Sequence, residues 1–94
     1  MSNSIDYIYT DKDDNPLYKQ VRIQKEDGKS FYSYRYQNGK WIIGLDGMER
    51  VLYNLSAVIS AVEKAQKIYW VEGEKDVETL KEKGLVATTI AGRR

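Results

Sequence analysis

The chain has 94 residues, and its 15 lysines and arginines nearly balance 14 aspartates and glutamates, for a formal net charge of +1 at pH 7. It contains no cysteine and no histidine, which excludes disulfides, zinc ribbons, thiol nucleophiles and imidazole bases, so any chemistry must use carboxylates, Lys, Arg, Tyr or backbone groups. The charges are spread evenly over the two halves of the chain, so neither half is a basic lobe for strong, non-specific binding of duplex nucleic acid.

The first half of the chain alternates between turn signals and stretches with the residue pattern of β-strands. Asp27-Gly28 and Asn38-Gly39 are strong signals for tight hairpins. Side chains of a strand alternate between two faces, so Tyr32, Tyr34 and Tyr36 are expected to share one face. We expect an antiparallel meander, spanning residues 1–47, with strands over residues 5–10, 17–24, 30–36 and 41–43.

The spacing of the apolar residues becomes helix-like after residue 47. From Leu55 to Val62 they recur three and four positions apart, as along one stripe of a helix. We therefore expect a helix over residues 55–64, with the Ser56 side chain as its N-cap.

A strand, a helix and a second strand are predicted for the rest of the chain. Residues 68–71 are a short, wholly apolar run, as expected of a strand that is buried on both faces. Acidic residues begin the helix over 76–83, Gly84 ends it, and the last strand covers 86–90. The sequence thus predicts an α+β fold, in which the meander is followed by a helix and a compact βαβ unit, residues 48–94.

The candidate catalytic residues directly follow the strand predicted over residues 68–71. Ligands of parallel sheets bind beyond the carboxyl ends of the strands, and Glu72-Gly73 follows this strand directly. Glu72, Glu74 and Asp76 supply oxygen, the ligand that Mg²⁺ prefers. The alternative is that Glu74 and Asp76 only stabilise the positive end of the helix that follows.

Residues 68–80, IYWVEGEKDVETL, resemble the first motif of Toprim domains, above all those of bacterial-type primases and of the primase-helicases of phages and mobile elements. That motif is an apolar strand, Glu-Gly, two variable residues, Asp and a helix. Residues 52–55, Gly84 and residues 86–92 also resemble the corresponding parts of these primases, so the likeness covers residues 49–92. The meander is similar to the leader that precedes this domain in phage-type primases.

The resemblance implies Mg²⁺-dependent phosphodiester chemistry with Glu72 as the catalytic acid or base, and with Glu72 and Asp76 as metal ligands. It implies single-stranded DNA template and nucleotides as partners, together with the rest of a primase or a helicase. Toprim domains complete their site with an Asp-x-Asp pair after a third strand, and this chain contains neither that pair nor the cysteines of a primase zinc site.

Two hypotheses follow. In the first, the chain is a fragment of a DNA replication primase that synthesises RNA primers, and it is inactive alone. In the second, it is a stand-alone small protein of a phage or mobile element that binds and inhibits a protein or a nucleic-acid complex.

Candidate nucleic-acid contacts are Arg22, Tyr34, Arg35 and Lys75, because tyrosines beside cations can stack single-stranded bases. The favoured alternative is that the tyrosine row packs against the helix as core. Trp41 and Trp70 are likewise expected in the core.

The sequence has no apolar run near the roughly 20 residues that span a bilayer. Its first residues lack the charged and apolar regions of a secretory signal. We therefore expect a cytoplasmic protein without a membrane partner.

Overall fold

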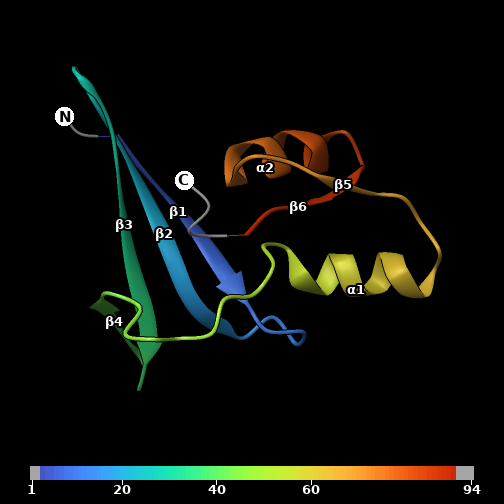
Figure 1. The fold of residues 1–94 in the computed structure, drawn as a ribbon, viewed down its shortest axis with the longest axis horizontal. Coiled ribbons are helices and arrows are strands. Elements are labelled where there is room, and N and C mark those ends of the chain that lie inside the picture. Colours follow the sequence, from blue (N-terminus) through green and yellow to red (C-terminus); the bar gives the residue numbers. More distant parts are fainter. Residues whose placement is uncertain (1–2, 91–94) are drawn as a thin grey trace.

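The computed structural model describes residues 3–90, which form a mixed α+β fold. The first half is a four-stranded antiparallel sheet in which each strand pairs with the next along the chain (Figure 1). Its strands are β1 (Asn3–Thr10), β2 (Pro16–Lys25), β3 (Gly28–Gln37) and β4 (Lys40–Ile43). The predicted meander is confirmed; its strands begin one or two residues earlier than predicted, and β2 and β3 also end one residue later.

The second half contains two helices and a parallel pair of short strands. Its elements are α1 (Leu55–Glu63), β5 (Ile68–Trp70), α2 (Glu74–Glu82) and β6 (Val86–Thr88). The predicted order of strand, helix and parallel strand is confirmed. Helix α2 begins two residues earlier than predicted, because Gly73 is its N-cap, and the final strand is two residues shorter.

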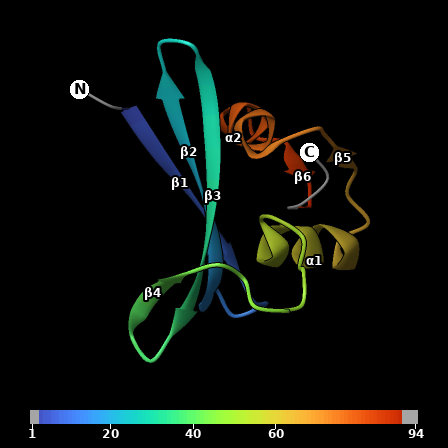
Figure 2. The ribbon, with the colours of Figure 1, turned by 60° about the vertical axis from the view of Figure 1, so that its left-hand side comes forward.

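One core joins the sheet to the second half. Both ribbon views place the helices on the same side of the sheet (Figures 1 and 2). Tyr9 stacks on Tyr18 with ring centroids 4.7 Å apart, and the Tyr53 ring lies 5.0 Å from that of Tyr9. The buried residues of this core are Tyr7, Tyr9, Tyr18, Tyr53, Val77 and Ala87.

The opposite face of the sheet, here called the outer face, is not covered by a helix (Figures 1 and 2). Tyr34 pairs with Lys19, whose neighbour Tyr18 is in the core, so the row of Tyr32, Tyr34 and Tyr36 lies on the outer face. The prediction that this row packs against a helix is therefore wrong. Trp41 pairs with Tyr36 and lies on the outer face too, not in the core.

Strand β5 was predicted to be buried on both faces, and this is wrong as well. Within residues 3–90 it pairs only with β6, in a two-stranded sheet, and Trp70 is 53% exposed. Tyr69 is also exposed. Two strands offer too little surface to bury both faces of an aromatic pair.

Helix α1 begins without the predicted cap. Asn54, in a left-handed conformation, is the N-cap residue, and its side chain makes no capping hydrogen bond. The Ser56 hydroxyl instead donates to Asp14 Oδ1 at 2.8 Å, which ties α1 to the turn after β1. The helix buries Val58 and Ala61 and leaves Val62 exposed, so its buried stripe is narrower than predicted. Within residues 3–90, no helix is long and apolar enough to cross a membrane.

Candidate functional site

The junction between β5 and α2 carries the predicted site. The Val71 amide donates to the Thr88 carbonyl at 3.0 Å, and the Thr89 hydroxyl donates to the Glu72 carbonyl at 3.2 Å. The backbone of Glu72 is thus held against the end of β6, while its side chain is exposed. Glu72 therefore lies beyond the carboxyl end of a parallel strand, as predicted.

Gly73 follows Glu72 and is the N-cap residue of α2. Its φ of −149° is extended, a conformation that any residue adopts, so the turn itself does not require glycine. A Cβ at this position would meet nothing within 4 Å. The missing side chain therefore leaves open space directly at the start of α2.

Two hollows meet at this junction. The first has a volume of about 540 Å³, and Glu72, Asp76 and Thr89 line it together with Trp70 and Val71. Two carboxylates and a hydroxyl thus share one hollow at the carboxyl edge of the parallel strands.

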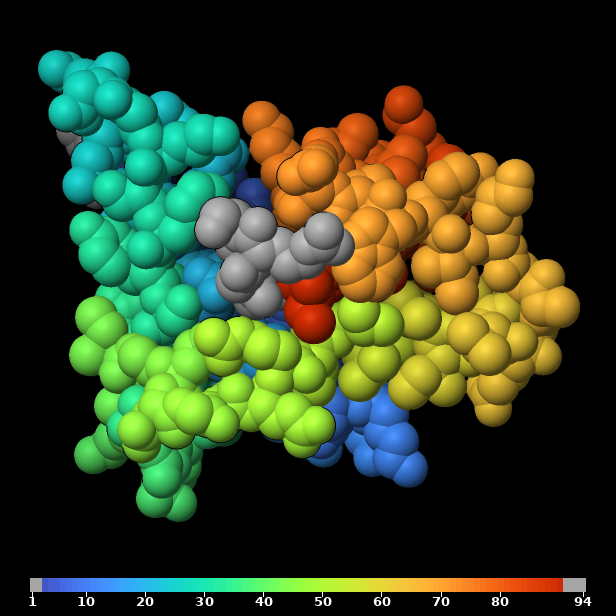
Figure 3. All heavy atoms as spheres, in the orientation of Figure 1, coloured from blue at the N-terminus to red at the C-terminus, as the bar shows by residue number. Residues whose placement is uncertain are grey.

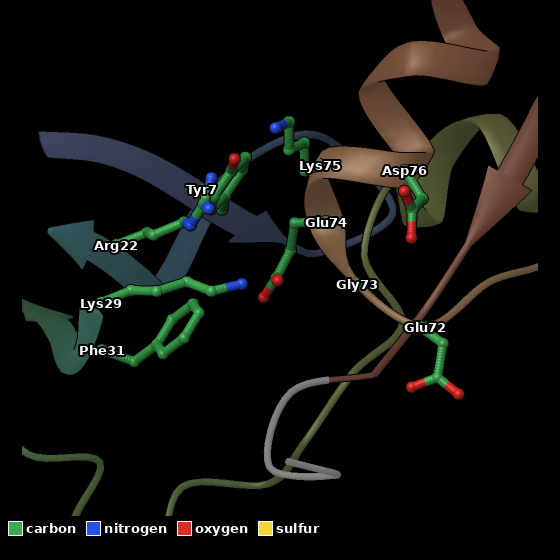
Figure 4. A pocket seen from close by; sticks show the side chains of 9 residues that line it. All are labelled: Tyr7, Arg22, Lys29, Phe31, Glu72, Gly73, Glu74, Lys75 and Asp76. Atoms are coloured by element: carbon green, nitrogen blue, oxygen red, sulfur yellow. The ribbon is translucent and has the colours of Figure 1, made fainter. Parts of the chain in front are cut away.

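The second hollow, of about 370 Å³, lies between the sheet and α2. The space-filling view shows the sheet on the left and the second half of the chain on the right (Figure 3). Its cations come from both sides: Arg22 and Lys29 from the sheet, and Lys75 from the first turn of α2. In Figure 4 Lys29 points toward Glu74, whereas Glu72 points away from the sheet. The other lining residues are Tyr7, Phe31, Gly73 and the three acids at the junction.

Glu74 is the unexpected residue of the junction. It is only 2% exposed, and the hydroxyl of the fully buried Tyr9 donates to its Oε2 at 2.7 Å. This bond joins residues 65 positions apart and ties the start of α2 to the sheet. No local signal marks Glu74 as buried, because an acid in the first turn of a helix is ordinarily exposed.

The four predicted nucleic-acid contacts do not form one surface. Arg22 and Lys75 line the second hollow, beside Glu72. Tyr34 lies on the outer face. Arg35 lies on the opposite face of the same strand, where its Nη1 donates to the carbonyls of Ile43 and Gly44 at 3.2 and 3.1 Å. Arg35 thus stabilises the end of β4 and is not free for a ligand.

Lys29 was missed in the sequence because its neighbours gave no motif. The hairpin register explains its position: Gln24 pairs with Lys29 and Arg22 with Phe31, so all four side chains lie on the face toward α2. The chain turns at Glu26-Asp27, so that Lys25 pairs with Gly28, and this turn sets the register.

The residues of the junction fit a magnesium ion only in part. Within residues 3–90, no group of three or more acidic, histidine or cysteine side chains could hold a metal. Mg²⁺ is, however, commonly bound through one or two carboxylates, with substrate phosphates and water completing its octahedron. Glu72 and Asp76, which line the same hollow, match that smaller set.

No known protein family, no curated protein and no solved structure matches this chain. The case for a function therefore depends on the geometry of the junction.

Proposed function

We propose that this chain is part of a Toprim-type DNA replication primase and that Glu72 and Asp76 belong to its Mg²⁺-dependent phosphoryl-transfer site. One observation supports this above all. Glu72 and Asp76 line both hollows, so a carboxylate-lined space lies directly beside a space with three cations. Phosphoryl transfer requires both kinds of group, since cations hold the phosphate oxygens and carboxylates manage protons and metal.

The roles of the residues follow from their positions. Arg22, Lys29 and Lys75 would hold the phosphates, aided by the amides at the start of α2. The open space at Gly73 lets a phosphate approach the backbone. A magnesium ion held by the two carboxylates would neutralise charge on the transferred group.

Glu72 is the residue suited to moving a proton. Among the described residues its carboxylate takes part in no hydrogen bond or ion pair, and it is exposed to the hollow. It would accept the proton of an attacking hydroxyl. Glu74, by contrast, is buried and bonded to Tyr9, so the alternative of a purely structural acid applies to Glu74 and not to Glu72.

Paramagnetic broadening by Mn²⁺ tests the proposal. Mn²⁺ added with a nucleoside triphosphate should broaden the amide signals of residues 71–76 in the wild-type chain. Glu72→Gln should strongly reduce this broadening, because it removes a charged metal ligand. Glu63→Gln is the matched control, since Glu63 is an exposed acid at the end of α1, and it should have no effect. Equal broadening in Glu72→Gln would refute the proposal.

The primase proposal also predicts how the isolated chain and a longer protein behave in activity assays. The chain alone should neither polymerise ribonucleotides nor cleave DNA with Mg²⁺ or Mn²⁺, because no Asp-x-Asp pair follows Glu72 within residues 73–94. In a longer protein in which such a pair follows residue 94, Glu72→Gln should abolish primer synthesis. Primer synthesis by the 94-residue chain would contradict this assignment.

A further inference from the structure

Strand β2 directs apolar residues away from the helices. An antiparallel sheet with one covered face ordinarily turns its apolar residues toward the core and its polar residues outward. In β2, however, the three residues that follow the core residue Tyr18 on the same face are all polar, whereas Val21 and Ile23, which lie between them, are on the outer face. The three polar residues are Gln20, Arg22 and Gln24. This alternation predicts that a further layer covers the outer face.

All four strands contribute apolar side chains to the outer face. Ile8 of β1 is opposite Lys19, and Trp41 of β4 is opposite Tyr36, so both lie on the face of the tyrosine row. Four large apolar side chains of this face are at least 37% exposed, and Ile43 is 65% exposed. They are Ile8, Tyr32, Tyr36 and Ile43. Aromatic and aliphatic side chains grouped in this way mark a protein interaction surface.

The charges in the middle of the outer face neutralise each other. Lys19 Nζ lies 2.9 Å from Asp6 Oδ2, and the same ammonium lies 4.5 Å from the centroid of the Trp41 ring. Within the four strands, the one other charged residue on this face is Lys25, at the end of β2 beside the hairpin turn. The face therefore offers little to a strongly charged partner, and two such faces can meet without like-charge repulsion at their centres.

The size of the outer face suits a reversible dimer. Its strands have 8, 10, 10 and 4 residues. Each residue of a sheet occupies about 3.3 Å along the strand and about 4.8 Å across it, so the flat area of the face is about 500 Å². Two such faces would together bury at least roughly 1,000 Å², the lower bound for a specific interface. An interface of this size forms reversibly, because obligate dimers bury about twice that area or more.

We infer that two copies of this chain pair through their outer faces, sheet against sheet, in a two-fold symmetric dimer. A second copy offers what the observations require of the occupant: an apolar face, neutral at its centre, and as broad as the face that it covers. Sheets that pack face to face lie about 10 Å apart, with their strands within about 30° of each other. The inference goes beyond the proposed phosphoryl transfer, because Glu72 and both hollows lie on the helix side of the sheet and stay open.

Analytical ultracentrifugation of the wild-type chain tests the inference. Concentrations from about 1 μM to about 1 mM are needed, because interfaces of this size are commonly weak. We expect the sedimentation coefficient to rise from that of a monomer to that of a dimer across this range, and to rise no further. A chain that stays monomeric at the highest concentration would overturn the inference and leave the outer face to a different partner. Growth beyond a dimer would also overturn it, because a two-fold interface closes after two copies.

Matched pairs of variants locate the interface. Tyr32→Lys should weaken the dimer at least roughly tenfold, because it buries an unpaired charge that faces its own copy. Its control is Tyr69→Lys, since Tyr69 is 38% exposed, against 39% for Tyr32, but lies on β5. Ile43→Lys should likewise weaken the dimer, and Val62→Lys on α1 is its control, since both side chains are 65% exposed. Circular dichroism verifies that each variant is folded. Equal weakening by the variants and their controls would overturn the inference.

Two further results separate this inference from its rivals. Glu72→Gln should dimerise as the wild-type chain does, so failure of the phosphoryl-transfer proposal would leave the dimer intact. The amide signals that shift with protein concentration should belong to β1, β2, β3 and β4. A dimer in which the shifting signals belong to α1 and α2 instead would overturn the inference, because the copies would then meet through the helices.

Discussion

The bond between Tyr9 and Glu74 should contribute a large part of the stability of this fold. Both side chains are buried, at 0% and 2% exposure, and their oxygens are 2.7 Å apart. Tyr9→Phe removes only the hydroxyl and keeps the ring that stacks on Tyr18. Hydrogen bonds to charged groups contribute about 1.5–3 kcal/mol. We therefore expect the free energy of unfolding to fall by about 2 kcal/mol.

Thermal unfolding followed by circular dichroism measures this loss. For a domain of this size, 1 kcal/mol lowers Tm by roughly 4–8 °C, so Tyr9→Phe should lower it by roughly 8–16 °C. Tyr36→Phe is the control, since its ring is on the outer face, and its change should stay within about 0.5 kcal/mol. A double-mutant cycle with Glu74→Gln then isolates the pairwise energy. If Tyr9→Phe and Tyr36→Phe lower Tm equally, packing alone joins the sheet to α2 and our reasoning about this bond is wrong.

Two other predictions concern ionisable groups. Glu72→Gln should change the free energy of unfolding by no more than about 0.5 kcal/mol, because Glu72 is exposed; a loss above about 1 kcal/mol in thermal melts would mean that this carboxylate is structural. Burial and the hydrogen bond to Glu78 strongly raise the pKa of Tyr53, so the folded chain keeps this proton while the unfolded chain releases it near pH 10. The stabilisation is complete below pH 10 and is lost as the pH rises further, by about 1.4 kcal/mol per pH unit. Tyr53→Phe should reduce the slope of stability against pH above 10 by that amount, and an unchanged slope would contradict the assignment.

The meander was predictable because the turn residues between its strands are recognisable in the local sequence. Asn38 and Gly39 both have positive φ, 51° and 78°, as the tight turn between β3 and β4 requires. Gly28 likewise has a positive φ, of 142°, at the turn between β2 and β3. The Asn38-Gly39 turn lies where its signal predicts and pairs Gln37 with Lys40, whereas the turn between β2 and β3 lies at Glu26-Asp27, one residue before the expected Asp27-Gly28.

The face of the sheet that is covered was not predictable in the same way. Alternation shows which residues share a face, but both faces of β2 and β3 carry apolar or aromatic residues. Tyr18 is fully buried in the core and Tyr34 lies on the outer face, although both are tyrosines in alternating strands. What separates them is where the second half of the chain docks, through contacts such as Tyr9 with Glu74 that link distant positions. No local pattern encodes such a contact.

The composition of both faces of the sheet depends on the register of one hairpin. The pairing of Arg22 with Phe31 directs Arg22 and Lys29 toward α2, where they line the hollow beside Glu72. The same pairing puts Tyr32 and Tyr34 on the outer face. Because side chains alternate, a slip of one residue in β3 would turn Lys29 away from α2 and both tyrosines toward the core. The Glu26-Asp27 turn therefore decides two properties at once: which cations reach the carboxylates, and which rings lie on the outer face.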